Sequence, residues 1–496
     1  MKFPKNHNFI KIYLHHLNDD DKTKFNECGI SNDIFPSNTL FNYPSFIQCL
    51  NTHKIRYFIV KWVATVRTST TNFVNSNIIA KLIFKSLFIL FIENEANLHT
   101  FRVSINSYTK YFHDVFELIL QNPNFIRNIK NLTFDVAVET DYISKLLVFL
   151  SSNCNSISSL DFLIDDYSAQ EALKYSLQII KSQVNLKKIL FGFSGFPFYH
   201  SLFSNCSNTL NTITFYYINF KNINVSNEVF ELLNVLESIH IIYCYPLNSD
   251  FIQQFINFTK PFKLKSLFLR EISSSQIESF KLLLQKSGDY LENFGISSRN
   301  LQPPLLESMI NYCSKISKIE FLDLSYTTLN NQNIYSAIGL IKINKQNLNY
   351  LSIGLVNSSW LLNSDTKYSS IVLQNLGQIL PSKLEYLNLA FHIKASDFKV
   401  FLKNSQNTFI KKLVINNYNR EDILPYLKEF IMKKKRVKYL AVRNSFFENI
   451  VFDHTLKCEE LFSLKDEVKE FKLHSIRVQN YDDLYIDIYE LIKKID

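Results

Sequence analysis

Glycine is scarce in this 496-residue chain, which contains only 8. Phosphate-binding loops need glycines at fixed positions, and neither G-x-G-x-x-G nor G-x-x-x-x-G-K-S/T occurs. Gly192 and Gly195 have the wrong spacing for the nucleophile turn of an α/β hydrolase, so we interpret them as a turn after a strand. The zinc motif H-E-x-x-H is absent as well. The sequence therefore predicts no catalytic residues, no cofactor and no metal site.

Paired cysteines and long apolar runs are also missing. None of the 7 cysteines belongs to a C-x-x-C motif, and Cys154 and Cys206 stand just before apolar repeat positions, which predicts buried free thiols in a reducing compartment. The most apolar segment, residues 78–92, is interrupted by Lys81 and Lys85 and is too short to cross a bilayer. The first residues lack the apolar core of a secretory signal. We therefore expect a cytoplasmic and/or nuclear protein that binds no membrane.

Charge of one sign is not concentrated, although the formal net charge is +9. The 54 basic and 45 acidic residues are dispersed along the chain, so we expect no nucleic-acid partner. One dense basic run spans residues 433–438, at the end of an expected helix. Cations are favoured at the negative end of a helix dipole; the alternative is a nuclear-import or phosphate-binding patch.

What the chain does contain is a repeat, which is clearest at Leu264-x-x-Leu267-x-Leu269. The same six-residue pattern returns in about fourteen copies, mostly about 26 to 29 residues apart, a period typical of leucine-rich repeats. The copies begin at Leu98, Ile129, Ile157, Leu186, Leu210, Leu236, Leu264, Leu291, Ile319, Leu348, Leu384, Ile410, Val437 and Val468. The predicted fold is an α/β, right-handed leucine-rich-repeat solenoid, a ribonuclease-inhibitor-like horseshoe.

Each repeat reads as a short strand, a polar turn and a returning helix. In the copy at Ile157, alternation sends Leu160 and Phe162 into the core and turns Asp161 and Leu163 to the other side. The Asp165-Asp166 turn and a helix over 168–183 follow. We therefore expect parallel strands on the concave side of the horseshoe and helices on the convex side.

Three domains are predicted from where the repeat starts and stops. Residues 1–97 form a helical lead-in and N-terminal cap, residues 98–479 form the solenoid, and residues 480–496 form a C-terminal capping helix. The repeat at Leu348 is the longest, with extra sequence at 357–367 that we expect to form a loop near the binding face.

The fifth and seventh positions of the repeats are expected to face solvent on the concave side. Apolar and aromatic residues occupy many of them in consecutive repeats, and a contiguous exposed apolar surface usually marks a binding site. The predicted binding residues are Leu163, Leu190, Tyr216, His240, Ile242, Phe268 and Arg270. The alternative is a slipped register that packs these side chains against the protein itself.

The lead-in resembles a known family in residues 9–22 (FIKIYLHHLNDDDK), in Gly29-Ile30 and in 41–46 (FNYPSF). These segments, and the repeats after them, are similar to the region that follows the F-box in fungal F-box/leucine-rich-repeat proteins. Only residues 1–8 precede the match, so the F-box itself is apparently absent or truncated.

The resemblance implies a substrate receptor of an SCF-type ubiquitin ligase. In that family the F-box docks on a Skp1-type adaptor and the solenoid captures a protein target on its concave face. The repeats alone predict only a protein-binding solenoid, so the alternative function is a free-standing interaction scaffold or decoy that recruits no ligase.

Overall fold

We analysed a computed structural model of the chain. It describes residues 9–28, 30–31, 34, 39–66, 73–105, 110–137, 141–164, 170–193, 202–220, 230–245, 252–253, 257, 263–270, 277–297, 319–327, 331–355, 366–419, 421–450 and 453–495. The chain forms two compact units. The first contains Met1–Thr214 and Ile223–Glu237, and the second contains Phe215–Asn222 and Ser238–Asp496.

The first unit begins with a helical lead-in. Its elements are α1 (Phe9–Leu14), α2 (Asp19–Glu27), the 3-10 helix η2 (Tyr43–Phe46), α3 (Thr52–Val66) and α4 (Phe73–Glu93). Helix α2 starts at Asp19, where the Asn18 side chain accepts a hydrogen bond of 2.8 Å from the Asp21 amide. A short strand, β1 (Cys49–Asn51), follows η2.

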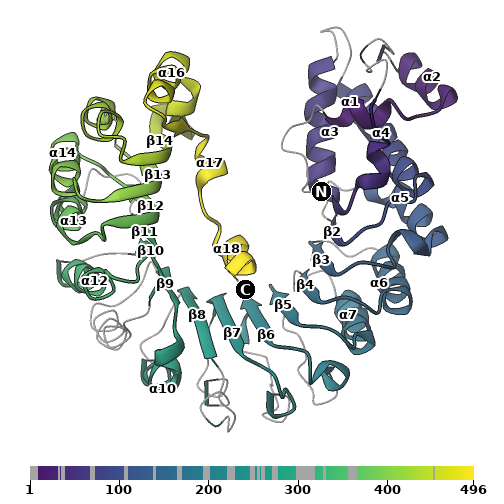
Figure 1. Cartoon of the computed structure of the whole chain (residues 1–496), viewed down its shortest axis with the longest axis horizontal. Helices are drawn as coiled ribbons and strands as arrows, with labels where there is room; N and C mark the ends of the chain where they lie inside the picture. Colours follow the sequence, from purple (N-terminus) through teal and green to yellow (C-terminus); the bar gives the residue numbers. More distant parts are fainter. Residues whose placement is uncertain are drawn as a thin grey trace. The chain divides into compact units, whose positions relative to one another are not determined.

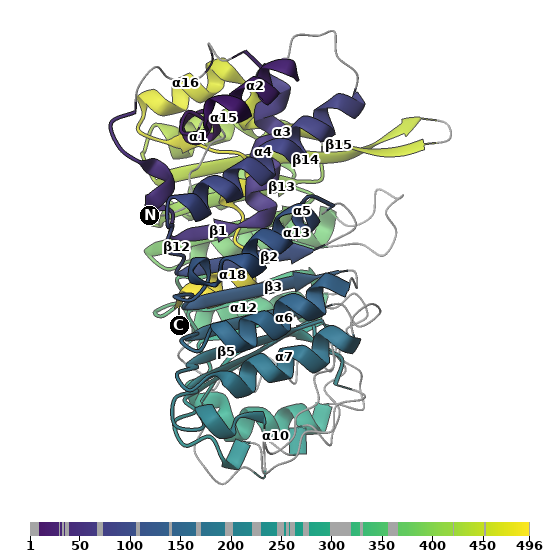
Figure 2. The ribbon, with the colours of Figure 1, turned by 90° about the vertical axis from the view of Figure 1, so that its right-hand side faces the viewer.

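Parallel strands and returning helices make up the rest of the first unit. Strands β1 to β6 neighbour one another in chain order, and the last residues of β6 belong to the second unit. The strands after β1 are β2 (Thr100–Ile105), β3 (Asn131–Val136), β4 (Ser159–Ile164), β5 (Lys188–Gly192) and β6 (Thr212–Tyr216). The helices are α5 (Lys110–Gln121), η3 (Pro123–Phe125), α6 (Asp141–Asn153), α7 (Gln170–Ser182) and η5 (Ser204–Cys206). Figure 2 shows α5, α6 and α7 lying side by side along the strands.

The second unit repeats the arrangement. Its parallel strands are β7 (Ser238–Cys244), β8 (Lys263–Arg270), β9 (Asn293–Ser297), β10 (Phe321–Thr327), β11 (Tyr350–Leu355), β12 (Lys383–Phe391), β13 (Phe409–Asn417) and β14 (Val437–Ile450). The helices between them are α10 (Ile277–Ser287), η8 (Gly288–Tyr290), α12 (Asn331–Ile343), α13 (Thr366–Ile379), α14 (Ala395–Asn404), α15 (Leu424–Tyr426) and the π-helix η9 (Leu427–Met432). Both units are therefore α/β leucine-rich-repeat solenoids, which confirms the predicted fold class.

Alternation within each strand separates two faces of the sheet. Leu160 and Phe162 are fully buried on the side of the repeat helices, as predicted, and the Phe162 ring stacks on Phe134 of the neighbouring strand with centroids 6.3 Å apart. We call the opposite side, which carries Asp161 and Leu163, the inner face.

The last predicted copy of the repeat is wrong. Thirteen copies, from Leu98 to Val437, lie at or beside the start of a strand, but Val468 lies in α16 (Lys465–Leu473). Asp466 and Glu467 in the first turn of α16 and Lys472 in its last turn suit a helix dipole, which favours this helix over a strand. Strand β14 pairs instead with the antiparallel β15 (Asp453–Glu460) and with β16 (Arg477–Val478).

The structure also shows the environment of the basic run and of the cysteines. Arg436 of the basic run is buried, and its guanidinium donates to the carbonyl oxygens of Leu402, Ser405 and Thr408, at the carboxyl end of α14. The six described cysteines are free thiols. The Asp165-Asp166 turn, Gly195 and the insertion at 357–367 lie outside the described residues.

Replacing Gly377 by Ala should destabilise the protein. A Cβ atom at Gly377 of α13 would lie 2.7 Å from the carbonyl oxygen of Phe401, and backbone gives way less easily than a side chain. We expect a loss of about 1–3 kcal/mol, measured by urea unfolding. The control is Gly339→Ala in α12, where a Cβ meets nothing within 4 Å and helix propensity should add about 0.5–1 kcal/mol. Equal midpoints for the two variants would contradict the packing of α13 on α14.

Candidate interaction surface

The inner face of the second unit is rich in aromatic and aliphatic side chains. Ile242 of β7, Phe268 of β8 and Phe321 of β10 form one buried cluster, and Tyr350 of β11 packs against it. Further along the sheet, Tyr386 of β12, Val414 of β13 and Ala441 of β14 form a second cluster. An apolar strip therefore runs across the strands.

The chain's own C-terminal segment covers this strip. After β16 the chain forms α17 (Tyr481–Leu484) and α18 (Ile488–Ile495), which lie on the inner face (Figure 1). Ile488, Leu491 and Ile492 of α18 belong to the same cluster as Ile242 and Phe268. We call residues 480–495 the tail.

The first half of the tail is anchored to the second cluster. Tyr481 and Leu484 are buried against Tyr386, Val414 and Ala441. The Tyr481 hydroxyl lies 3.5 Å from Asn388 Oδ1, at the limit of a hydrogen bond, and the Tyr386 hydroxyl accepts one of 3.3 Å from the Ile486 amide. Burial raises the pKa of Tyr386, so its hydroxyl stays protonated well into the alkaline range.

The tail forms two short helices where the sequence predicts one helix from Tyr481 to Ile495. The backbone of Tyr485 leaves the helical conformation at ψ 133°, and Asp487 starts α18 by accepting a hydrogen bond of 2.8 Å from the Tyr489 amide. The same geometry begins α17, where the Asn480 side chain accepts from the Asp482 amide. The break lets both helices contact the sheet.

Arg443 of β14 ties the tail to the β14–β15 hairpin. Its guanidinium donates to Glu460 and to Asp482, each at 2.7 Å, and lies 4.4 Å from the centre of the Tyr481 ring. Burial lowers the pKa of Arg443, but the hydrogen bonds that it donates to both carboxylates, together with their charges, raise the pKa by more, so the cation persists. Glu460 is shielded and Asp482 is mostly exposed, so the inner of the two ion pairs should be the stronger.

The prediction that concave positions face solvent is wrong for the second unit. Ile242 and Phe268 are completely buried, because α18 covers them. Tyr216 is half-buried, and its ring lies 5.2 Å from that of Tyr489 in α18. The register was correct, since these side chains do point to the inner face.

His240 is also buried, within a row of polar residues that crosses three strands. His240 Nδ1 and the Ser266 hydroxyl are 2.8 Å apart, and the Asn293 amide donates to the same hydroxyl at 2.9 Å. These buried side chains therefore link three neighbouring strands through hydrogen bonds. Arg270 ends β8, and its side chain lies outside what the structure describes.

The two predicted residues in the first unit are also buried. Leu163 retains 5% of its exposure and Leu190 7%, so the predicted exposure is wrong here too. Beside Leu163, the buried Asp161 carboxylate accepts a hydrogen bond of 2.9 Å from Thr133 on the adjacent strand.

Sequence reasoning missed the aromatic residues at the third position of three later repeats. Phe321, Tyr350 and Tyr386 stand two residues after the repeat starts Ile319, Leu348 and Leu384, on the same face as the fifth position. Alternate residues of a strand share a face, so including the third position with the fifth and seventh would have identified these residues.

A missing side chain makes room for Phe268. A Cβ atom at Gly295, on the adjacent strand β9, would overlap the Phe268 ring. The ring therefore lies over the Gly295 backbone, and residues of α18 pack in the same cluster as the ring. This is one of the few positions where the chain needs glycine.

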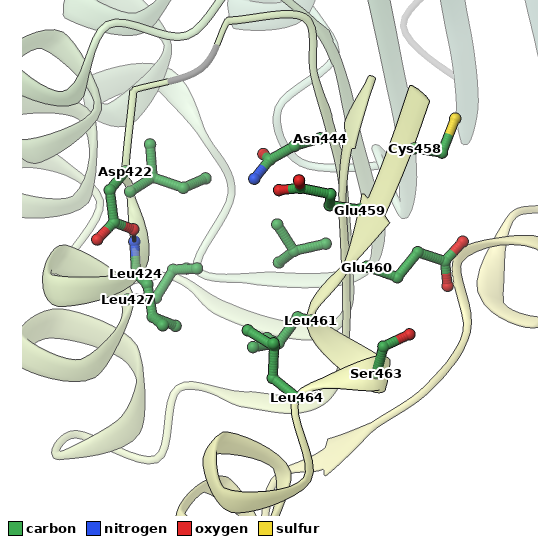
Figure 3. A pocket seen from close by; sticks show the side chains of 12 residues that line it. Asp422, Leu424, Leu427, Asn444, Cys458, Glu459, Glu460, Leu461, Ser463 and Leu464 are labelled. Atoms are coloured by element: carbon green, nitrogen blue, oxygen red, sulfur yellow. Dashed lines mark hydrogen bonds between the residues drawn. The ribbon is translucent and has the colours of Figure 1, made fainter. Parts of the chain in front are cut away.

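A separate pocket of about 350 Å³ lies between α15, η9 and the base of the hairpin (Figure 3). Leu424, Leu427, Leu461 and Leu464 supply apolar walls, and its polar lining residues include Asp422, Asn444, Glu459 and Glu460. Figure 3 shows Asn444 and Glu459 close together, while Glu460 points away from them. The Glu459 carboxylate and the Asn444 amide oxygen would suit an apolar ligand that carries a hydrogen-bond donor.

The described residues contain no group of three or more His, Cys, Asp or Glu side chains that could hold a metal ion. Within the same residues, no helix has both the length and the apolar character needed to cross a membrane.

No family model and no curated protein matches this sequence. Among solved structures, the yeast Rad7 and Elc1 complex is similar over 67% of this chain and 76% of that chain, with 16% identity and a TM-score of 0.37. LegL7, a leucine-rich repeat-containing protein from Legionella pneumophila, is similar over 69% of this chain and 90% of that chain, with 9% identity and a TM-score of 0.32. These likenesses are weak, so the fold assignment rests on the strand order and register.

Replacing Phe268 by Ala should destabilise the protein, although the sequence predicted a surface residue there. Removing a fully buried phenylalanine costs about 3–5 kcal/mol, because a cavity remains under α18. Urea unfolding measures the loss. Tyr335→Ala on the exposed side of α12 is the control and should change stability by less than about 0.5 kcal/mol. Similar small changes in both variants would show that α18 does not cover Phe268.

Proposed function

We propose that this protein is a protein-binding solenoid that acts as the substrate-recognition part of an SCF-type ubiquitin ligase receptor. One observation carries the binding proposal: the inner face of the second unit already holds a polypeptide segment, through aliphatic and aromatic contacts of the kind found in protein interfaces. The role is non-catalytic.

The proposed target contacts are the residues singled out from the sequence. The target binds Tyr216, His240, Ile242, Phe268 and Arg270 in the second unit when the tail is not in place. In the first unit, taken by itself, the proposed contacts are Leu163 and Leu190. The burial of Ile242 and Phe268 against aliphatic residues of α18 supports this, because apolar side chains are favourably removed from water by an apolar ligand. We place this activity in the cytoplasm or nucleus, in keeping with the free thiols.

The proposed adaptor contact lies in the lead-in. Three of its large apolar side chains are exposed to solvent: Leu40 is 89% exposed, Phe41 58% and Phe46 51%. They fall in or beside the segment that resembles the post-F-box region. An exposed apolar patch of this kind is the usual mark of a protein contact. The alternative function, a free-standing scaffold or decoy, requires no adaptor.

Binding of a purified Skp1-type adaptor separates the two functions. A receptor should retain the adaptor in size-exclusion chromatography, and Phe41→Asp with Phe46→Asp should weaken binding at least tenfold, because two charges would enter an apolar contact. Tyr335→Asp, an exposed aromatic on α12, is the matched control and should bind normally. No retention by the unmodified chain would favour the scaffold.

Target binding is tested by variants at the inner face. For a partner that co-purifies with the chain, Tyr216→Ala and Arg270→Ala should each cost roughly 1–3 kcal/mol of binding free energy by calorimetry, as interface aromatics and arginines do. Both variants should keep the melting temperature within a few degrees, since Tyr216 is only half-buried. Tyr335→Ala is again the control. Unchanged affinity in both variants would place the target elsewhere on the chain.

A further inference from the structure

The contacts of α18 follow a known code for helix recognition. Its three buried aliphatic residues, Ile488, Leu491 and Ile492, stand at positions i, i+3 and i+4 and therefore share one side of the helix. Tyr489 adds an aromatic contact with Tyr216 at one edge. An amphipathic helix that lays such a face on an apolar surface is a recurring way in which proteins bind peptide segments.

The tail is attached to the sheet differently from the way the strands are attached to one another. Strands β12, β13 and β14 share continuous ladders of backbone pairing. Helix α18 contacts the inner face through side chains and is preceded by the non-helical residues Tyr485 to Asp487. Alone, a helix of eight residues is far too short to be stable in water, so α18 depends on the surface beneath it.

We propose that the inner face of the second unit is a docking surface for an amphipathic helix of a partner protein, and that α18 occupies this surface until the partner displaces it. The inference rests on the proposed function and specifies the side chains by which the partner helix binds. That helix presents aliphatic residues at i, i+3 and i+4 with a neighbouring aromatic residue. Arg443 additionally favours an acidic, aromatic segment just before the helix, as Asp482 and Tyr481 provide in the tail.

The tail also sets how strongly a partner must bind. A tethered segment has an effective concentration in the millimolar range, so a free helix of equal intrinsic affinity competes poorly with it. Weakening the tail should therefore open the surface to ligands that the intact chain excludes.

The test uses a fluorescent synthetic peptide of residues 480–496 and the full chain. Ile492→Asp on α18 should release the tail and changes no residue of the inner face. The peptide should then bind this variant at least about tenfold more tightly than it binds the unmodified chain, measured by fluorescence anisotropy. Lys493→Asp, at the next and exposed position of α18, is the matched control and should still exclude the peptide. The peptide carrying the Ile492→Asp change should not bind any of the three chains.

A second peptide tests the class of partner. It keeps aliphatic residues at the spacing of Ile488, Leu491 and Ile492 and the aromatic residue at 489, with Lys and Glu elsewhere, and it should bind the released variant like the tail peptide. A version with the same composition and a scrambled spacing should not. Equal binding of both versions would overturn helix recognition.

Hydrogen exchange of the unmodified chain keeps the proposal testable if Ile492→Asp does not fold. Amides of Leu491 and Ile492 should exchange at least about tenfold faster than those of β12 and β13, because the tail opens locally while the sheet stays formed. Equal exchange rates would show that α18 is a permanent part of the core and would overturn the proposal.

Three more outcomes are informative. A folded Ile492→Asp variant that does not bind the tail peptide overturns the inference, even if a target binds the chain elsewhere. If the variant binds the peptide but no target or adaptor is ever found, the proposed function fails while the inference stands. A released variant that forms dimers with the tail of one copy on the next would replace the partner helix by a second copy of this chain.

Discussion

A parallel sheet has to be covered on both faces, because its strands carry apolar side chains on each of them. In the second unit the two covers come from different parts of the chain. The repeat helices cover one face, each next to its own strand. The other face is covered by the tail, so that Tyr481 meets Asn388 across 93 positions of sequence. The local pattern of the repeats determines the first cover, and only the folded sheet determines the second.

The inner face is not uniformly apolar, and its polar residues determine where a second cover can lie. His240, Ser266 and Asn293 bond to one another in a row, and Asn388 donates to Ser352. These hydrogen bonds form between strands of the sheet itself, so an apolar segment can lie against the neighbouring positions without breaking them. Internal pairing of the polar residues thus makes the face suitable for an apolar ligand.

The period of the sequence was enough to place thirteen strands and to say which side chains meet the helices, because both properties depend on residues close together in the chain. It failed at Val468, where apolar spacing alone does not distinguish a strand from a short helix. The aliphatic spacing of Leu484, Ile488, Leu491 and Ile495 predicts a C-terminal capping helix, but periodicity does not say what such a helix packs against. The exposure assigned to Phe268 was wrong for that reason: its cover is more than 200 residues away in the sequence.

The free energies of burial and of backbone ordering in the tail explain why another helix can replace it on the inner face. Burying one isoleucine or leucine contributes about 1.5–3 kcal/mol, whereas ordering the backbone of one residue costs about 1–2 kcal/mol. Only some residues of α18 are buried, so burial and ordering nearly cancel over its eight residues. The tail and a partner helix compete for the same surface. Because binding is reciprocal, each weakens the binding of the other by the same free energy. The tail therefore shields the apolar strip from water and sets a threshold of affinity that a partner has to exceed.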